Sequence, residues 1–137
     1  MQEKTKEHAW LLGVRVHRIS LDGLLEKFAE YVEEKNLDHP RKIMYVNVHC
    51  LNLAYFDAKY RCILNEADIV YPDGIGIILG ARICGRYLKQ RMTAADFLGD
   101  FCRDWARRGY GLYFFAGAPG VAAEAAKRLR HAVPGLR

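Results

Sequence analysis

The stretch that decides the fold is Ala67-Asp68-Ile69-Val70-Tyr71-Pro72-Asp73-Gly74-Ile75-Gly76. Its apolar run is too short for a helix and ends at Pro72, and the two glycines let the backbone approach another group closely. We interpret the run as a strand that delivers the carboxylate of Asp73 to a sheet edge, before a helix from Gly74 to about Cys84. Asp73 is therefore the leading candidate for a catalytic residue.

The rest of the chain repeats this alternation of strand and helix. The patterns predict one or two strands over 10–19, an N-cap at Ser20 with a helix to about residue 36, a strand over 43–48, a helical stretch over 51–64, a helix over 94–108, a strand over 111–116 and a helix over 121–131. Such alternation predicts an α/β fold, with a Rossmann-like parallel sheet flanked by helices and ligands at the carboxyl ends of the strands. Residues 134–137 resemble a turn into another strand, so we expect a single α/β domain over 1–137 whose sheet is incomplete at the C-terminus.

Composition limits the class of protein. With 137 residues, 51% of them hydrophobic and 27% charged, the chain is long and apolar enough for a compact domain. No apolar run approaches the roughly 20 residues that span a bilayer, and the charged N-terminus does not resemble a secretion signal, so we expect a cytoplasmic protein. The four cysteines form no C-x-x-C pair, which argues against a zinc site or a disulfide framework.

The net charge is +5, and basic residues cluster over 82–91, 103–108 and 127–137. Such a surface favours phosphates or anionic lipid headgroups. No nucleic-acid-binding motif accompanies it, so we expect no nucleic acid partner, and a solvated helix face explains much of the clustering equally well.

The candidate site residues each have a structural alternative. Asp73 could serve only as a turn residue that caps the next helix, but a carboxylate at a strand exit can also accept a proton from a hydroxyl nucleophile. Thr93 and Asp96 have the spacing of a helix capping box. Arg91, just ahead of that helix, is suited to binding a diphosphate, because its fork of donors and the free helix amides act on the same anion.

Other polar positions follow predicted strands. Asn47 and His49 lie at the exit of the strand over 43–48 and could hydrogen-bond a sugar or a base, although a lone histidine there is more often structural. Gly74 and Gly117 lie in glycine turns that match neither a P-loop nor the full dinucleotide fingerprint, so they are weak signals for a nucleotide.

Several short motifs agree with one family in order and spacing. They are Val46-Asn47-Val48-His49-Cys50-Leu51-Asn52-Leu53-Ala54, Leu64-Asn65-Glu66-Ala67-Asp68, Pro72-Asp73-Gly74-Ile75-Gly76, Arg91-Met92-Thr93-Ala94-Ala95-Asp96 and Phe115-Ala116-Gly117-Ala118-Pro119-Gly120-Val121. In this arrangement the chain resembles the WecG/TagA/CpsF family of glycosyltransferases over nearly its whole length. It departs from the family at Tyr45, where many members have threonine, and members continue beyond the point where this chain ends.

The resemblance implies an inverting, metal-independent enzyme without a cofactor. Such an enzyme moves N-acetylmannosamine or a related sugar from a UDP donor to a polyprenyl-diphosphate-linked acceptor, in cell-envelope polysaccharide synthesis of the teichoic acid, enterobacterial antigen or capsule type. It implies a peripheral position at the inner face of the plasma membrane. Asp73 would be the general base and Arg91 would neutralise charge on the diphosphate. The substrate-binding residues we expect are Asn47, His49, Gly74, Arg91, Thr93, Asp96 and Gly117.

Two alternatives remain open from the sequence. One is a nucleotide-dependent oxidoreductase with a Rossmann-like sheet, and the other is a non-catalytic fragment that binds UDP-sugar without turnover. A truncated sheet exposes apolar faces and edges, which leaves homo-oligomerisation open as well.

Overall fold

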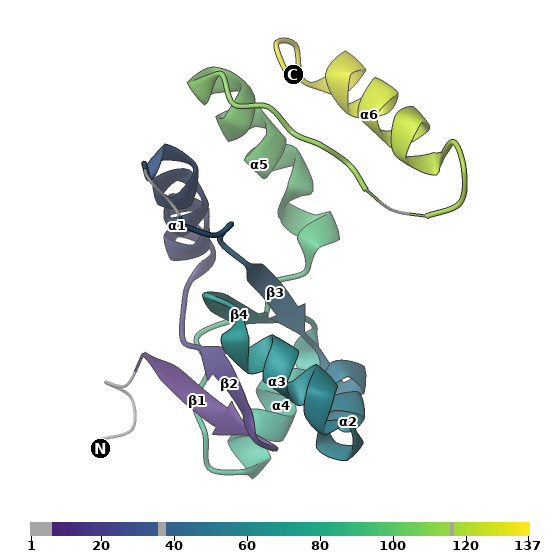
Figure 1. Cartoon of the computed structure of the whole chain (residues 1–137). Helices are drawn as coiled ribbons and strands as arrows, with labels where there is room; N and C mark the ends of the chain where they lie inside the picture. Colours follow the sequence, from purple (N-terminus) through teal and green to yellow (C-terminus); the bar gives the residue numbers. More distant parts are fainter. Residues whose placement is uncertain (1–6, 36–37, 116) are drawn as a thin grey trace. The chain divides into compact units, whose positions relative to one another are not determined.

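The structure, a computed structural model, describes residues 7–35, 38–115 and 117–137. The elements follow the chain as β1 (His8–Leu11), β2 (Val14–His17), α1 (Leu21–Glu33), β3 (Ile43–Val46), α2 (Val48–Phe56), α3 (Ala58–Glu66), β4 (Ile69–Pro72), α4 (Ile75–Ile83), α5 (Ala94–Arg108) and α6 (Val121–Ala132). They belong to two compact units, Met1–Thr93 and Ala94–Arg137 (Figure 1).

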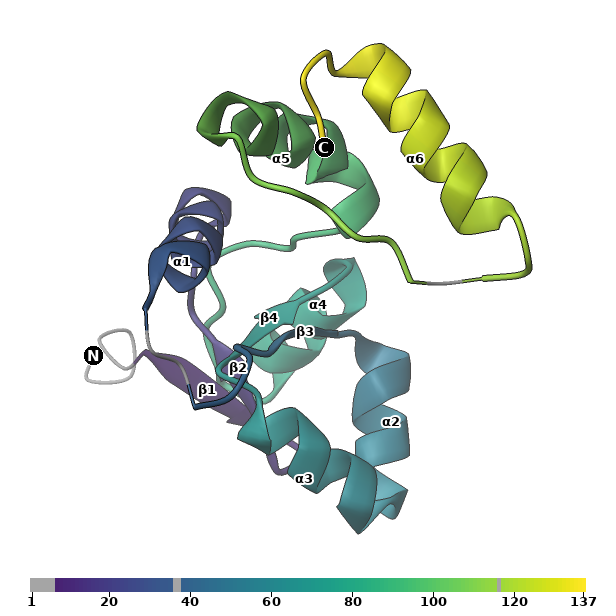
Figure 2. The ribbon, with the colours of Figure 1, turned by 45° about the horizontal axis from the view of Figure 1, so that its top comes forward.

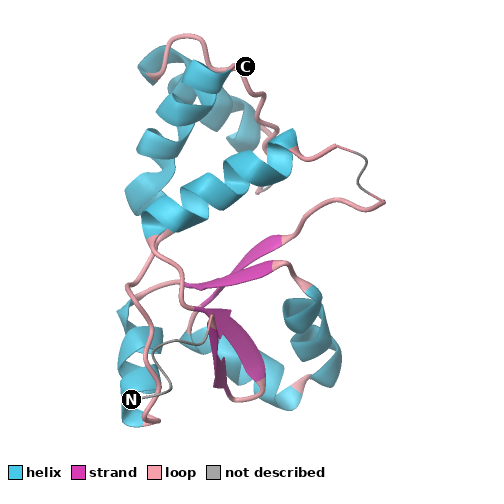
Figure 3. Ribbon diagram, turned by 90° about the vertical axis from the view of Figure 1, so that its left-hand side faces the viewer, coloured by secondary structure: helices cyan, strands magenta, loops and turns pink. Residues whose placement is uncertain are grey.

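The first unit is built around a parallel pair of strands, β3 and β4. Their register runs from Ile43 opposite Ile69 to Val46 opposite Pro72. All four residues of β4 are buried, as expected for an apolar strand that is covered on both faces. The prediction of an α/β fold with a parallel sheet and flanking helices is confirmed (Figure 3).

The hairpin β1–β2 is antiparallel and turns at Leu12 and Gly13, which both have positive φ values of 47° and 79°. Two consecutive residues with positive φ give the tight two-residue turn that suits the twist of a hairpin. The side chain of Asn65, near the end of α3, fastens this turn. Its Oδ1 accepts from Arg15 N–H at 2.9 Å and its Nδ2 donates to Gly13 O at 2.9 Å.

A histidine ties the hairpin to the parallel pair. Nδ1 of His17 accepts a hydrogen bond from Val70 N–H at 3.0 Å, so the edge of β4 meets a side chain of β2. The bond requires an unprotonated Nδ1. Burial lowers the pKa of His17, and the neighbouring charge of Arg15 lowers it further.

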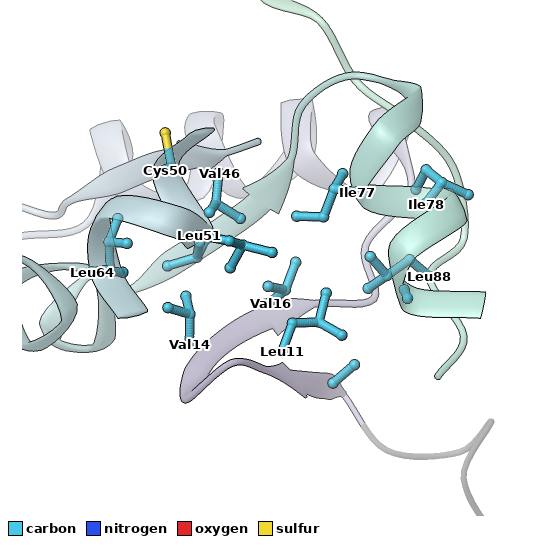
Figure 4. Close-up of a cluster of buried hydrophobic side chains, with 14 of the residues drawn as sticks. Leu11, Val14, Val16, Val46, Cys50, Leu51, Leu64, Ile77, Ile78 and Leu88 are labelled. Carbon is cyan, nitrogen blue, oxygen red and sulfur yellow. The ribbon is translucent and has the colours of Figure 1, made fainter. Parts of the chain in front are cut away.

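The hydrophobic core of the first unit lies between the hairpin, the parallel pair and the helices α2, α3 and α4 (Figure 4). Each element contributes buried side chains, among them Val14 and Val16 from the hairpin, Val46 and Val70 from the parallel pair, Leu51, Leu64 and Ile77 from the helices. The core therefore joins segments from both ends of this unit.

The predicted elements of the first unit are confirmed with two changes. Ser20 caps α1, its Oγ accepting from Gly23 N–H at 3.3 Å. The strand over 43–48 ends earlier, because Asn47 caps α2 and Val48 begins that helix. The helical stretch over 51–64 is divided at Asp57, whose Oδ1 accepts from the N–H groups of Lys59 and Tyr60. A new helix therefore starts there, and α2 and α3 run in different directions (Figure 2).

The second unit consists of α5, a connecting segment and α6. The bounds predicted for α5 are confirmed, and Phe97, Cys102 and Trp105 form its buried face. The ring of Trp105 packs edge-on against Tyr110 at 5.2 Å between centroids, just after the helix ends. The alanine-rich segment forms the helix α6, as its pattern predicts, and it contains no glycine. None of the residues of this helix is buried.

The strand predicted over 111–116 is wrong for the described residues 111–115, and Ala116 lies outside the described part. Leu112 N–H donates to Arg137 O at 2.8 Å, and Tyr113 and Phe115 are 89% and 92% exposed. Aromatic residues favour strands only where they pack on a pleated, half-buried surface beside a partner strand. The described residues provide no such partner, so the pattern alone does not form a strand.

We predict that acid weakens the first unit through His17. Because its pKa is lowered in the folded chain, the unfolded chain takes up the proton more readily, and stability falls as the pH drops below about 6.5, the value of an unshifted histidine. Urea unfolding at pH 7.5 and 5.5 measures this loss. Asn at position 17 can still accept a hydrogen bond but does not titrate, so His17→Asn should show a smaller loss than the wild type.

The exposed His49 supplies the control, since His49→Asn should leave the pH dependence unchanged. The charges of Glu7, His8 and Arg15 also act on the pKa of His17, and these residues remain in both variants. An equal loss of stability in the wild type and His17→Asn would contradict the role of this tether.

Candidate functional site

The parallel pairing places two of the candidate residues side by side. Val46 and Pro72 are opposite each other at the ends of β3 and β4, and Asn47 and Asp73 follow them directly. Asp73 N–H donates to Val46 O at 2.9 Å, which continues the pairing one residue beyond the strands. Neighbouring strands lie ~5 Å apart, so the two side chains begin from adjacent points of one sheet edge.

Asn47 is the N-cap of α2. Its Oδ1 accepts from Cys50 N–H at 3.0 Å, which leaves the two donors of its amide group unused by the cap. His49 lies in the first turn of the same helix and is exposed. Asn47 thus stabilises the start of α2 through its Oδ1, and its amide N–H groups are hydrogen-bond donors that a ligand at the sheet edge could use.

The start of α4 depends on two glycines. Gly74 is the N-cap and has φ 80° and ψ 161°, a conformation that residues with a side chain rarely adopt. A Cβ on Gly76 would lie 2.8 Å from Cγ2 of Val48, so any other residue here would force that side chain to move away from the first turn of α4. Because Gly74 occupies the N-cap position, the carboxylate of Asp73 is not the N-cap group of this helix.

Asp73 is half-buried beside two tyrosines that our sequence interpretation did not assign to the site. Burial raises the pKa of Tyr71, and the negative charge of Asp73 and then Tyr45 act in the same direction. Tyr45 and Tyr71 are opposite each other in the register, with ring centroids 6.4 Å apart. Alternation along a strand could have revealed this neighbour, since residues 71 and 73 share one face.

A third segment is held against the same edge. Met92 is buried, and its N–H donates to Pro72 O at 2.9 Å, so residues 91–93 run next to the end of β4. Nη1 of Arg91 donates to Oγ1 of Thr93 at 3.1 Å. The guanidinium of Arg91 and the hydroxyl of Thr93 therefore belong to a segment that runs beside the end of β4, which no local sequence pattern indicated.

Two of the expected site residues lie in the second unit. Asp96 is exposed in the first turn of α5. Gly117, with φ 75°, belongs to the turn before α6 and lines an open cavity of about 370 Å³ together with Phe114 and Pro119. Asn47, Gly74, Asp73, Arg91 and Thr93 are brought together within the first unit.

A larger cavity, of about 550 Å³, opens at the other end of β4. Among its lining residues are His17, Arg18, Ser20, Asp68 and Lys89. The carboxylate of Asp68 is already engaged there, accepting from Lys42 N–H and from Arg41, each at 2.8 Å. Partial burial would raise the pKa of Asp68, but these hydrogen bonds outweigh it and hold the pKa below its usual value. Asp68 therefore fixes the start of β4. Ligands of a parallel sheet bind at the carboxyl ends of its strands, which is the opposite edge.

Part of the basic surface is engaged in ion pairs along the helices. On α5, Asp100 pairs with Arg103, and Asp104 pairs with both Arg107 and Arg108. Such exposed pairs contribute little to stability. They show that part of the clustered positive charge is balanced by acidic neighbours one turn away.

No helix in the described part of the chain is both long and apolar enough to cross a bilayer. Within residues 7–35, 38–115 and 117–137, no three side chains of His, Cys, Asp or Glu gather in an arrangement that could hold a metal ion.

Comparison with known proteins shows the family to which the sequence is similar. The model of the family described as "Glycosyl transferase WecG/TagA/CpsF family" matches residues 9–137. Over 118 residues the chain is 25% identical to an N-acetylglucosaminyldiphosphoundecaprenol N-acetyl-beta-D-mannosaminyltransferase of Bacillus spizizenii (strain ATCC 23059 / NRRL B-14472 / W23). The alignment covers 85% of this chain and 46% of that protein, so the chain spans about half the length of the curated relative it matches.

We predict that the backbone of Gly74 is required for the site to form. A Cβ at this position would meet no atom within 4 Å, so the cost of Gly74→Ala is that of forcing a residue with a side chain to φ 80°. We expect a loss of ~1–3 kcal/mol in the free energy of unfolding, measured with urea.

Gly80→Ala is the matched control on the same helix. Its added Cβ also has open space, but its backbone is helical, so alanine should stabilise the chain by ~0.5–1 kcal/mol. If Gly74→Ala were as stable as the wild type, the geometry at the start of α4 would not need glycine.

Proposed function

The chain belongs to the WecG/TagA/CpsF family of glycosyl transferases, and from this we propose that the edge formed by Asn47, Asp73 and residues 91–93 holds a UDP-sugar and transfers its sugar to a lipid-linked acceptor. The observation that carries the proposal is the meeting of three segments at one sheet edge. Register places Asn47 beside Asp73, and the bond from Met92 to Pro72 adds Arg91 and Thr93. The match of the family model to residues from both compact units supports a single transferase domain.

Asp73 is the proposed general base. Its carboxylate takes the proton of the acceptor hydroxyl, whose oxygen attacks the anomeric carbon of the donor sugar. The new bond from carbon to oxygen forms as the bond to the UDP oxygen breaks, and UDP leaves with the electron pair. A single displacement from the opposite face inverts the anomeric centre. Asp73 is half-buried, and Gly74 rather than Asp73 is the N-cap of α4; both observations support this role.

Arg91 is the proposed binder of the diphosphate of the donor. A guanidinium offers paired donors to phosphate oxygens, and the bond to Thr93 Oγ1 orients its side chain. The first turns of α2 and α4 begin next to the same edge, and their free amides and helix dipoles favour a second anionic group there, such as the diphosphate of the acceptor. Charge that develops on the leaving UDP would thus be stabilised by Arg91 without a metal ion.

The nature of the two substrates follows from the relative. That protein's name specifies N-acetylmannosamine as the transferred sugar and N-acetylglucosaminyl-diphosphoundecaprenol as the acceptor. For this chain we propose N-acetylmannosamine or a related sugar and a polyprenyl-diphosphate-linked acceptor of the cell envelope. Such an acceptor is held in a membrane, so the transfer would take place at the inner membrane surface.

We predict that Asp73→Asn lowers transfer by about 10²–10⁴-fold, the range expected for the loss of a general base. The assay follows labelled sugar from UDP-N-acetylmannosamine onto a polyprenyl-diphosphate-linked N-acetylglucosamine. UDP affinity, measured by calorimetry, should stay within about threefold, a change of under 1 kcal/mol. The substitution preserves the shape of the side chain and removes only its basicity.

Asp38→Asn is the matched control, because it removes the same charge from an exposed loop position. It should leave both transfer and UDP affinity unchanged. Unchanged transfer by Asp73→Asn would contradict the assignment of the base. UDP binding without turnover by the wild-type chain would instead favour the non-catalytic binding function, and tight binding of NAD(P) without a response to UDP would favour the oxidoreductase.

A further inference from the structure

An apolar cavity of about 310 Å³ lies beside the candidate site, within the first unit. The hairpin β1–β2, the helix α2 and the helix α4 form its walls. Trp10 and Leu12 come from the hairpin, Val48 and Leu51 from α2, Ile77 and Gly80 from α4. Its volume is at the lower end of the range for small-molecule sites.

Glycine keeps this cavity open along α4. Gly76 and Gly80 are four residues apart and therefore share one face of the helix, and both line the cavity. A Cβ on Gly80 would meet no atom within 4 Å, so the space above it is empty of protein. A helix interior that has glycine at such a position gives up stability, and here the result is room for an apolar group.

The cavity continues from the candidate site. Val48 directly follows Asn47, and Gly76 lies three residues after Asp73, so the first turns of α2 and α4 contribute to both. Their N-termini favour an anion, whereas the cavity walls behind them are mostly apolar, with Asn52 and Arg86 as the polar and charged members of the lining. A ligand that fits both parts has an anionic head and an apolar tail.

We propose that this cavity receives the first part of the polyprenyl chain of the acceptor, with the diphosphate at the sheet edge. This inference rests on the function proposed above and adds where the lipid binds. The cavity holds only a short length of chain, and the remainder would pass Trp10 and Leu12, which are each 51% exposed at the hairpin. The indole ring suits such a position, since it has an apolar body and a polar N–H.

Farnesyl diphosphate, a short and water-soluble prenyl diphosphate, is the probe for this site. Its binding should shift the fluorescence of Trp10 to shorter wavelength, and the shift should be lost in Trp10→Phe, which keeps the buried Trp105. Inorganic diphosphate should cause no such shift. Absence of any response in the wild type would overturn the proposal.

Gly80→Leu fills the cavity and should weaken farnesyl diphosphate binding by about tenfold or more, the effect of losing the apolar contacts of one isoprene unit. Leucine also favours the helix, so the melting temperature should not fall. Ile83→Ala on the same helix is the control, because Ile83 is exposed and does not line the cavity. It should bind the probe as the wild type does, and equal binding by Gly80→Leu would overturn the proposal.

Two further measurements separate other outcomes. If sedimentation shows a dimer that Gly80→Leu dissociates, a second copy of the chain occupies the cavity and the lipid proposal fails. UDP binding by calorimetry tests the proposed function independently. Binding of UDP without farnesyl diphosphate would overturn only the lipid site, and the reverse result would overturn the proposed function while the apolar chain site remains.

Discussion

The parallel pairing of β3 with β4 is the constraint on which the rest of the structure depends. Its register sets Val46 opposite Pro72, so the residues that follow, Asn47 and Asp73, emerge together at one edge. The same edge then organises its surroundings, because Pro72 O accepts the N–H of Met92 and thereby positions Arg91. A slip of one residue would turn the side chains to the opposite face and separate these groups. The site is therefore a consequence of strand register and not of any single motif.

Contacts of high sequence separation hold this pair in place. His17 of the hairpin bonds to Val70 on the edge of β4, and Asn65 of α3 bonds to the hairpin turn. Glycine serves the opposite purpose at α4, where Gly74 and Gly76 allow an unusual backbone and a close approach to α2. Together these features leave polar groups at the N-termini of two helices and an apolar cavity behind them. An acceptor that joins a diphosphate to a polyprenyl chain matches that division.

Local patterns predicted those elements whose first and last residues are marked by a cap or by the end of an apolar run. Ser20 starts α1 and the apolar run ends at Asp73, and both are visible in the sequence. Asp57 divides a continuous apolar pattern, because its side chain caps a new helix, a detail that apolar periodicity does not contain. The strand over 111–116 had the right residue types but no partner in the described chain. For the site, the expectation that ligands bind at the carboxyl ends of parallel strands indicated the proximity of Asn47 and Asp73. The hydrogen bond from Met92 to Pro72 joins residues 20 positions apart and has no local signal in the sequence.

The most direct test of the central claim, that the carboxyl edge of β3 and β4 binds the donor, is to titrate UDP into the ¹⁵N-labelled chain and follow the backbone amides by NMR. The account predicts that the largest shifts arise at Asn47, Asp73, Gly74 and residues 91–93. Shifts confined to the larger cavity at the opposite end of β4, around Ser20, Gly23 and Asp68, would contradict it.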